Sequence, residues 1–256
     1  MKNLQGKQTV KKYMYTILPF FIVLAVWWLL SRVFPSYILP SPASVVLDLL
    51  NPRWRWSYQI YITLQEVLIG YAISIIFGIL LGIIISWNSI IKRMLMPIIV
   101  FTNSIPKIAA APIILVWFGY GIIPNVIMVF LISFFPILLN TTIGLTEVPF
   151  EMIELAKTYN TPKWKIYLKI RIPCSLPYIF AGLKLASIMA VTGAIIGEFI
   201  ASEKGVAALI MQAQASIETS VMIGALLWIA AISLLLYGFV GLVEKIFMPW
   251  ADSEKE

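Results

Sequence analysis

Residues 147–173 read EVPFEMIELAKTYNTPKWKIYLKIRIP and form the one long charged, amphipathic stretch of an otherwise apolar chain. Glutamates lie early in this stretch and lysines late, with apolar side chains between them, as the dipoles of two successive helices favour. Asn160 tolerates the left-handed conformation that ends many helices. Thr161 then suits the cap of a new helix and Pro162 its first position. The stretch therefore predicts two short helices joined by a turn.

The rest of the chain has the composition of a membrane protein. Of its 256 residues, 61% are hydrophobic and 12% are charged, against about 25% charged in soluble domains. A soluble core could not bury so much apolar surface, so we expect the chain to use lipid as its solvent. The chain has one cysteine, Cys174, and no histidine. We therefore expect neither an internal disulfide nor a metal cluster of histidine and cysteine ligands. The net charge of +7 is spread beside apolar runs, so no nucleic-acid partner is expected.

Uncharged runs predict an all-α protein with six membrane-crossing helices. One crossing needs about 20 apolar residues. The expected crossings are 13–31, 67–91, 94–118, 122–145, 175–197 and 219–243. They form one transmembrane domain over 17–248, flanked by tails at 1–16 and 249–256. The external segment 34–60 is expected to include a short helix capped by Ser41.

Lysine and arginine fall mainly on one side of this six-helix arrangement. Cytoplasmic loops carry an excess of these residues. The richer side holds Lys2, Lys7, Lys11, Lys12, Lys92, Arg93, Lys157, Lys163, Lys165, Lys169, Arg171, Lys245 and Lys255, and the other side holds Arg32, Arg53, Arg55 and Lys204. We therefore expect both termini and residues 147–173 to lie in the cytoplasm.

Two of the spans carry small residues at every fourth position. In lipid, helices associate by close van der Waals approach, which small residues permit. The two stripes are Gly70, Ser74, Gly78, Gly82 and Ser86, and Gly182, Ala186, Ala190 and Ala194. We expect these faces to be helix–helix interfaces, within one chain or between two copies.

A few polar residues inside the spans are candidates for a translocation pathway. Lys107 follows Pro106 near the middle of a span, and a charge at that depth is a functional candidate by default. It could favour an anionic substrate, or it could cap a carbonyl where Pro106 and Pro112 break the helix. Glu198, at the outer end of the fifth span, is interpreted as a structural ion pair or gate contact, and 201–217 could fold back as a short external gate helix. The other candidate wall residues are Asn103, Ser104 and Gln212.

The stretch 147–173 also resembles the signature loop of binding-protein-dependent ABC importer permeases. That signature runs Glu-Ala-Ala, three residues, Gly, nine residues, then Ile-x-Leu-Pro. This chain has Glu154-Leu155-Ala156, Asn160 and Ile170-Arg171-Ile172-Pro173 at the same spacing. Two of its three departures are apolar exchanges, and Asn is the next best residue to Gly in a left-handed turn. The resemblance implies that the residues coupling the permease to an ATPase are Glu151, Glu154, Leu155, Ala156, Asn160 and Pro173.

Further segments are similar to the nitrate/sulfonate/taurine-type branch of that family. They are Leu39-Pro40-Ser41-Pro42, Ser104-Ile105-Pro106-Lys107-Ile108-Ala109, Ala111-Pro112, Trp117-Phe118-Gly119-Tyr120-Gly121, Phe134-Phe135-Pro136-Ile137, Gly197-Glu198-Phe199 and Gln212-Ala213-Gln214. The resemblance covers about residues 35–248. It implies a type I ABC importer permease of the cell membrane, working as a homodimer with two cytoplasmic ATP-binding subunits and an external substrate-binding protein.

The same resemblance implies what the chain carries and what it leaves to its partners. ATP and Mg would bind in the partner ATPase, so this chain is expected to be no enzyme and to hold no cofactor or metal. The implied substrate is a small nutrient such as nitrate, a sulfonate or taurine, or a vitamin-related molecule such as a thiamine pyrimidine precursor or riboflavin.

Two other classes of protein remain alternatives. An ion-coupled secondary transporter could use a buried carboxylate such as Glu66 or Glu198, but it would leave the motif in 147–173 unexplained. An intramembrane enzyme would need a catalytic constellation, and the chain has no histidine and no Gly-x-Ser-x-Gly or His-Glu-x-x-His motif.

Overall fold

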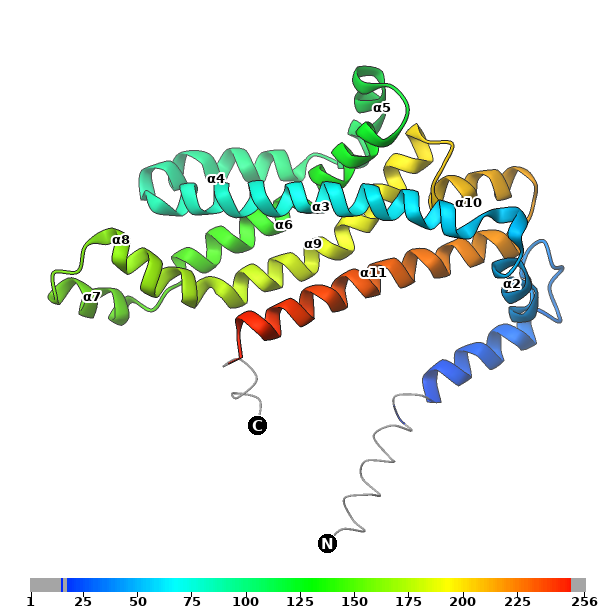
Figure 1. Ribbon diagram of the computed structural model, residues 1–256, viewed down its shortest axis with the longest axis horizontal. Helices are drawn as coiled ribbons and strands as arrows, with labels where there is room; N and C mark the ends of the chain where they lie inside the picture. Colours follow the sequence, from blue (N-terminus) through cyan, green and yellow to red (C-terminus); the bar gives the residue numbers. More distant parts are fainter. Residues whose placement is uncertain (1–14, 16–17, 250–256) are drawn as a thin grey trace, which may run out of the picture. The chain divides into compact units, whose positions relative to one another are not determined.

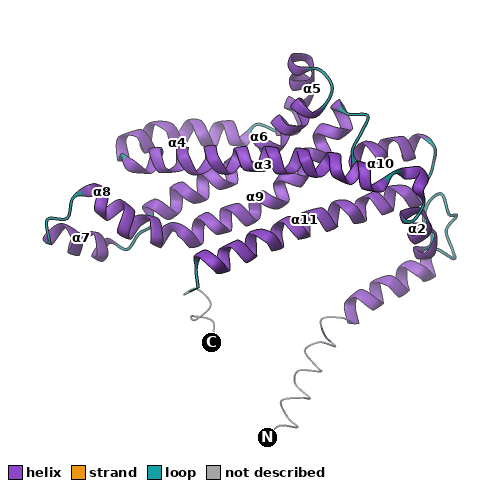
Figure 2. Ribbon diagram, in the orientation of Figure 1, coloured by secondary structure: helices purple, strands orange, loops and turns teal. Residues whose placement is uncertain are grey.

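The computed structural model describes Tyr15 and residues 18–249, and regular structure within these residues is helical, without a strand (Figure 2). Apart from Tyr15 and Pro249, the expected tails 1–16 and 249–256 lie outside the described residues. By their internal contacts the described residues form two units. Unit 1 comprises the chain up to Trp56 together with Leu209–Leu227, and unit 2 comprises Ser57–Ala208 together with the chain from Trp228 onward.

Unit 1 holds a helix over Leu18–Leu30, α2 (Pro42–Leu49), a 3-10 turn η1 (Pro52–Trp54), and parts of α10 (Val206–Ala215) and α11 (Thr219–Phe247). α2 begins as the sequence predicts, because the Ser41 hydroxyl accepts a hydrogen bond from the Ser44 amide at 3.2 Å. Ser220, in the first turn of α11, donates to Asp48 of α2 at 2.5 Å. These contacts tie the helical segment near Pro42 to the start of α11.

The described residues contain four helices that are long and apolar enough to cross a membrane. They are Pro52–Trp87, which includes α3 (Trp56–Trp87), then α6 (Ile122–Thr146), the continuous helix Lys163–Ala201, and α11. The helix Leu18–Leu30 is shorter, and the crossing expected over 13–31 includes residues outside the described ones. The expected number of six crossings therefore stays a prediction.

The crossing expected over 94–118 is broken at Pro106, one of the two prolines at which the sequence allows a helix break. The structure has two helices there, α4 (Ser89–Ser104) and α5 (Lys107–Phe118), bent by 86°. Proline lacks an amide donor and pushes the preceding residue into an extended conformation. Ile105 is extended, with φ −69° and ψ 127°, directly before Pro106. The break therefore falls where local backbone chemistry requires it.

The fifth expected crossing, over 175–197, begins earlier than the sequence predicts. α8 (Lys163–Ile166) continues through a π-helical turn, η2 (Tyr167–Arg171), into α9 (Ile172–Ala201). Pro173 lies in the first turn of α9, where it cannot donate to a carbonyl one turn earlier. A wider π turn just before this proline lets the helix continue. A continuous helix therefore runs from residue 163 to residue 201.

α6 lies between α3 and α9 in unit 2 (Figure 1), and the two small-residue stripes pack against it. A Cβ atom added at Gly78 of α3 would lie 2.8 Å from the Ile137 side chain, and one added at Gly182 of α9 would lie 2.7 Å from the Asn140 side chain. Ser74 of α3 also shares a hydrogen bond of 2.7 Å with Ser133 of α6. The expectation that these stripes form helix–helix interfaces within the chain is confirmed.

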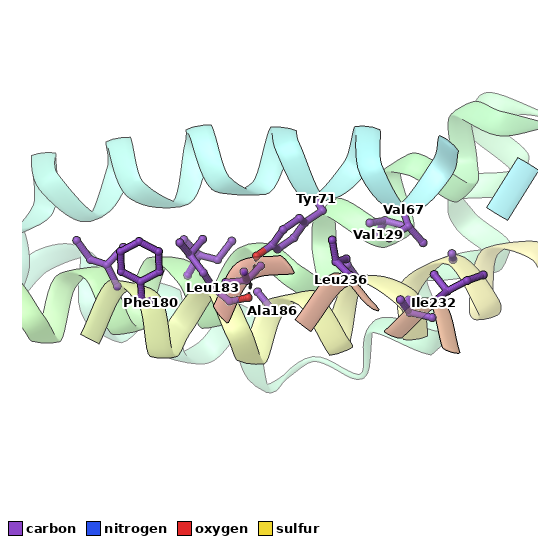
Figure 3. Close-up of a cluster of buried hydrophobic side chains, with 14 of the residues drawn as sticks. Val67, Tyr71, Val129, Phe180, Leu183, Ala186, Ile232 and Leu236 are labelled. Carbon is purple, nitrogen blue, oxygen red and sulfur yellow. Dashed lines mark hydrogen bonds between the residues drawn. The ribbon is translucent and has the colours of Figure 1, made fainter. Parts of the chain in front are cut away.

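The apolar core of unit 2 fills the space that α3, α6, α9 and the later part of α11 share. Figure 3 shows Val67 and Tyr71 of α3 beside Leu183 of α9 and Leu236 of α11. The Tyr71 hydroxyl donates a hydrogen bond of 2.8 Å to the Leu183 carbonyl. This bond satisfies the one polar atom that the tyrosine brings into the core.

Replacing Gly193 by alanine should weaken the contact between α9 and α6. The new Cβ would lie 2.7 Å from Val129 Cα and 3.0 Å from the Met128 carbonyl oxygen, and backbone atoms cannot move aside. We expect a loss of about 1–3 kcal/mol in the free energy of unfolding, measured by thermal unfolding in detergent. Gly238→Ala is the matched control, because nothing lies within 4 Å of a Cβ there. Equal melting temperatures for the two variants would contradict this packing.

Candidate functional site

The charged stretch folds as a helix pair, as predicted, and its first helix is α7 (Phe150–Thr158). The helix ends in a left-handed residue, Asn160, with φ 50°. The Thr161 amide donates to the Ala156 carbonyl at 3.1 Å, and the Asn160 amide donates to the Lys157 carbonyl at 2.8 Å. These two bonds form a Schellman motif, which satisfies carbonyls that the helix end would otherwise leave unpaired. The predicted conformation of Asn160 is confirmed.

The start of the second helix differs from the prediction by one residue. Thr161 is not the cap; Pro162 occupies that position in an extended conformation and has no side-chain cap bond, so α8 begins at Lys163. The Pro162 carbonyl accepts the Lys165 amide at 2.9 Å. With Thr161 already used by the Schellman motif, the Pro162 backbone supplies the first turn.

α7 exposes both its predicted coupling residues and a group of large apolar side chains. Glu151, Glu154 and Leu155 are exposed, while Ala156 is half-buried. Glu154 pairs with Lys157 at 2.9 Å along the same helix. Leu155 is 62% exposed, and the neighbouring exposed apolar side chains are Phe150, Met152 and Tyr159. Of the other predicted coupling residues, Asn160 and Pro173 are exposed in the turn and at the start of α9.

Tyr167 of η2 fixes the second half of the pair to the bundle. Its hydroxyl lies 2.5 Å from the Ser86 hydroxyl and donates to the Ile83 carbonyl at 3.2 Å. Its ring centroid lies 4.7 Å from that of Trp87, at the end of α3. The Arg171 guanidinium reaches the Leu145 carbonyl of α6 at 3.4 Å. Movement of the pair would therefore reach α3, α6 and α9 directly.

The structure brings two predicted pathway residues together at the break between α4 and α5. The Lys107 amine donates to the Asn103 carbonyl at 2.6 Å and to the Asn103 side-chain oxygen at 2.7 Å. It also lies 4.9 Å from the centre of the Phe135 ring. Ser104 donates to the Val100 carbonyl at 2.9 Å. Lys107 thus has the alternative geometry considered above, in which it caps a helix carbonyl.

Glu198 is fully buried and holds the start of α10. Its carboxylate accepts the amides of Ala207 and Ala208 at 2.6 and 3.3 Å, and the Thr63 hydroxyl at 2.5 Å. Thr63 in turn accepts the Val206 amide at 2.9 Å. The carboxylate therefore serves as a cap for the helix expected within 201–217. Its observed role is a structural contact and not an ion pair.

Sequence reasoning named Glu66 only under the secondary-transporter alternative and missed Asn125. The Asn125 amide donates to Glu66 at 2.8 Å, and both side chains are buried. A Cβ added at Gly197 would lie 2.8 Å from the Asn125 backbone and side chain, so the glycine makes room for the amide. A sequence signal for this pair was available, because Glu66 and Asn125 are polar residues within two apolar spans, where burying a polar group costs free energy.

Gln212 lies in α10, within unit 1, and its side chain is exposed. Its predicted role in the pathway stays a prediction, as do the roles of Asn103, Ser104 and Lys107.

Glu198→Ala should loosen the start of α10. The substitution removes the acceptor of two buried amides and one buried hydroxyl, at about 1–3 kcal/mol for each donor left unpaired. We expect a lower melting temperature and faster proteolysis within 202–218. Glu203→Ala is the control, because Glu203 is an exposed carboxylate in the adjoining loop. If the two variants behaved alike, the capping role of Glu198 would be refuted.

The helical spans, with the amphipathic pair at their end, define a polytopic membrane protein. Comparison with known proteins gives its family. Residues 74–249 match the family model described as binding-protein-dependent transport system inner membrane component. The chain belongs to this family, and it is therefore a permease subunit of an ABC importer.

Named relatives and a solved structure agree with this assignment. A probable ABC transporter permease protein of Haemophilus influenzae is 34% identical and aligns with 84% of this chain and 89% of its own length. The riboflavin transport system permease protein RibX of Chloroflexus aurantiacus is 33% identical and aligns with 86% of this chain and 83% of its own length. The formylaminopyrimidine transport permease protein ThiX of Halalkalibacterium halodurans is 31% identical and aligns with 92% of this chain and 95% of its own length.

Among solved structures, an inward-facing MetNI methionine ABC transporter chain superposes with a TM-score of 0.65 at 17% identity, over 74% of this chain and 94% of that one. This likeness supports the expected type I permease fold. The family assignment selects the ABC permease over the ion-coupled secondary transporter.

Proposed function

We propose that α7 is the surface on which a cytoplasmic ATP-binding subunit docks, and that this chain lines the pathway while its partner hydrolyses ATP. The observation that carries the proposal is the exposure of Phe150, Leu155 and Tyr159 beside Glu151 and Glu154 on one short helix. Large apolar side chains gathered on a water-facing helix mark a site of protein contact. ATP and Mg would then bind in the partner subunit, and this chain would be no enzyme itself.

A continuous helix supports a mechanical link from this surface to the other end of the bundle. The helix from Lys163 to Ala201 begins beside α7 and ends next to Glu198, which holds the start of α10. A displacement of α7 by the ATPase would turn this helix against α6, to which it packs closely. Transport is coupled only if substrate and ATP favour different arrangements of these helices.

The break between α4 and α5 supports a second permease copy. Ser104, Ile105 and Pro106 interrupt the helix and are exposed in the single chain. Irregular backbone at membrane depth is tolerated only where protein covers it or where it lines a water-filled cavity. A homodimer with two ATP-binding subunits and an external substrate-binding protein would meet this requirement, with Asn103 and Lys107 near the pathway.

The distribution of lysine and arginine supports an orientation with both termini in the cytoplasm. Docking of an ATP-binding subunit on α7 requires the same orientation, so a test of docking also tests the orientation.

Glu154→Lys should prevent assembly with the ATP-binding subunit. The reversed charge would lie on the exposed face of α7 beside Lys157, where it costs only about 0.5 kcal/mol within the helix. It would also repel a cation or hydrogen-bond donor of the ATPase that binds the original glutamate. We expect normal membrane insertion, loss of the ATPase from affinity purification, and loss of transport.

The matched control is Glu203→Lys, which makes the same charge change at an exposed position on the predicted external side. It should co-purify with the ATPase as the unmodified chain does. Full assembly and transport by Glu154→Lys would exclude α7 as the docking surface.

For the substrate we propose a nitrogen-containing heteroaromatic compound related to a vitamin. The relatives named for riboflavin and formylaminopyrimidine are 33% and 31% identical to this chain, while those named for nitrate and sulfonates are 25–28% identical. The Lys107 amine is already bound by Asn103, which weakens the case for a dedicated anion ligand.

The substrate class can be tested on the external binding protein that co-purifies with the complex. We expect riboflavin or a formylaminopyrimidine to raise its melting temperature, because a bound ligand stabilises the folded state. Nitrate and taurine should leave it unchanged. A shift with nitrate or taurine alone would reject the heteroaromatic class and leave the importer assignment intact.

A further inference from the structure

A pocket of about 540 Å³ lies inside unit 2, between the helix pair and the ends of α3 and α6. The turn from α3 to α4 forms one wall and the helix pair forms another. The lining residues are Ser86, Trp87, Asn88, Ser89, Lys92, Thr146, Ile153, Lys157, Lys163, Ile166, Tyr167 and Arg171. They come from separate segments of the chain, so only the tertiary structure creates this pocket.

The charge of the lining is one-sided. Lys92, Lys157, Lys163 and Arg171 contribute positive charge, and among the described residues that line the pocket none is an aspartate or a glutamate. Lys157 bonds Glu154 at 2.9 Å, but that glutamate lies outside the lining. Lys92 donates only to an uncharged partner in the described structure, the Thr146 hydroxyl, at 3.1 Å. Converging cations of this kind attract a compact anion.

The first turn of α4 adds to this positive field. Asn88 caps the helix by accepting the Ile90 amide at 2.8 Å, and Ser89 begins the helix in the pocket wall. The amino end of a helix carries a partial positive charge that favours phosphate groups. The helix end and the four cations therefore both favour the binding of a phosphate in this pocket.

The position of the pocket indicates the source of such a phosphate. α3 ends at Trp87 and α6 ends at Thr146, so the pocket lies where apolar spans give way to charged sequence. Trp87 lines it and, like Ile90 next to it, is exposed. Tryptophan favours the level of lipid headgroups, and basic pockets between helices on the cytoplasmic side bind anionic headgroups.

We propose that this pocket binds the phosphate of an anionic phospholipid headgroup, with Lys92 and Lys163 as its main ligands and the acyl chains lying against Trp87 and Ile90. The bound headgroup would link α4 to α7 and α8, and would brace the helix pair against the bundle. This site goes beyond the proposed function and rests only on its orientation, in which the helix pair lies on the cytoplasmic side of the membrane.

The test is lipid retention by the full-length chain in mild neutral detergent, followed by native mass spectrometry during titration with phosphatidylglycerol or phosphatidylcholine. The unmodified chain should prefer phosphatidylglycerol. Lys92→Gln/Lys163→Gln should bind it about thirtyfold more weakly, since each cation near a headgroup contributes about 1 kcal/mol. Phosphatidylglycerol should also raise the melting temperature of the unmodified chain but not of this variant.

The matched control is Arg93→Gln/Lys165→Gln, which removes two cations from the same two helices but outside the pocket lining. It should retain the unmodified affinity. Equal losses in the two double variants would overturn the proposal, because general surface charge would then explain binding. Equal retention of the two lipids by the unmodified chain would also overturn it.

Two further outcomes identify other occupants. If inorganic phosphate raised the melting temperature of the unmodified chain and phosphatidylglycerol did not, the site would be one for a free anion and the lipid would be excluded. If Lys92→Gln/Lys163→Gln lost the ATP-binding subunit but kept its lipid preference, the pocket would belong to the protein interface and the proposal would fail.

Discussion

The close approach of α3 and α9 to the backbone of α6 is the constraint on which the rest of unit 2 depends. Lipid provides no hydrophobic force between helices, so their association relies on van der Waals contact and buried hydrogen bonds. α3 and α9 approach α6 so closely that a Cβ would not fit at Gly78 or at Gly182. Ser74 of α3 adds a hydrogen bond to Ser133 of α6. The buried hydrogen bonds of Glu198 and Glu66, the apolar core and the anchored helix pair all rest on this three-helix contact.

Glu198 and Lys107 both bond groups that lie at helix breaks. The Glu198 carboxylate replaces a missing helix cap for α10, and Thr63 both donates to it and accepts the Val206 amide. Lys107 similarly caps the end of α4, because its amine donates a hydrogen bond to the Asn103 carbonyl. In each case a charged group compensates for backbone atoms that a helix break leaves unpaired. The Lys107 and Glu198 side chains therefore help to stabilise the irregular backbone at the α4–α5 bend and before α10.

The helix pair combines a free face with a fixed one. α7 exposes Leu155 and its acidic neighbours, while Tyr167 anchors the second helix through Ser86 and Trp87. The π turn lets this anchored segment continue into α9 despite Pro173. A partner that moved the free face would act on a stiff helix instead of a flexible linker.

The sequence by itself determined the membrane class, the helix pair, its Asn160 turn and the family motif, because composition, capping and spacing depend on neighbouring residues. It also indicated the two stripes of small residues, because a repeat at every fourth position can be read along a single helix. It offered a break at Pro106 and placed the start of the second helix of the pair within one residue, but it did not predict the angle of 86° or the continuation of the helix from Lys163 to Ala201. Only the tertiary structure brought Thr63 to Glu198, Asn125 to Glu66, and Lys92 and Lys163 into one pocket. Those groups come from distant segments, and helix packing alone decides which of them meet.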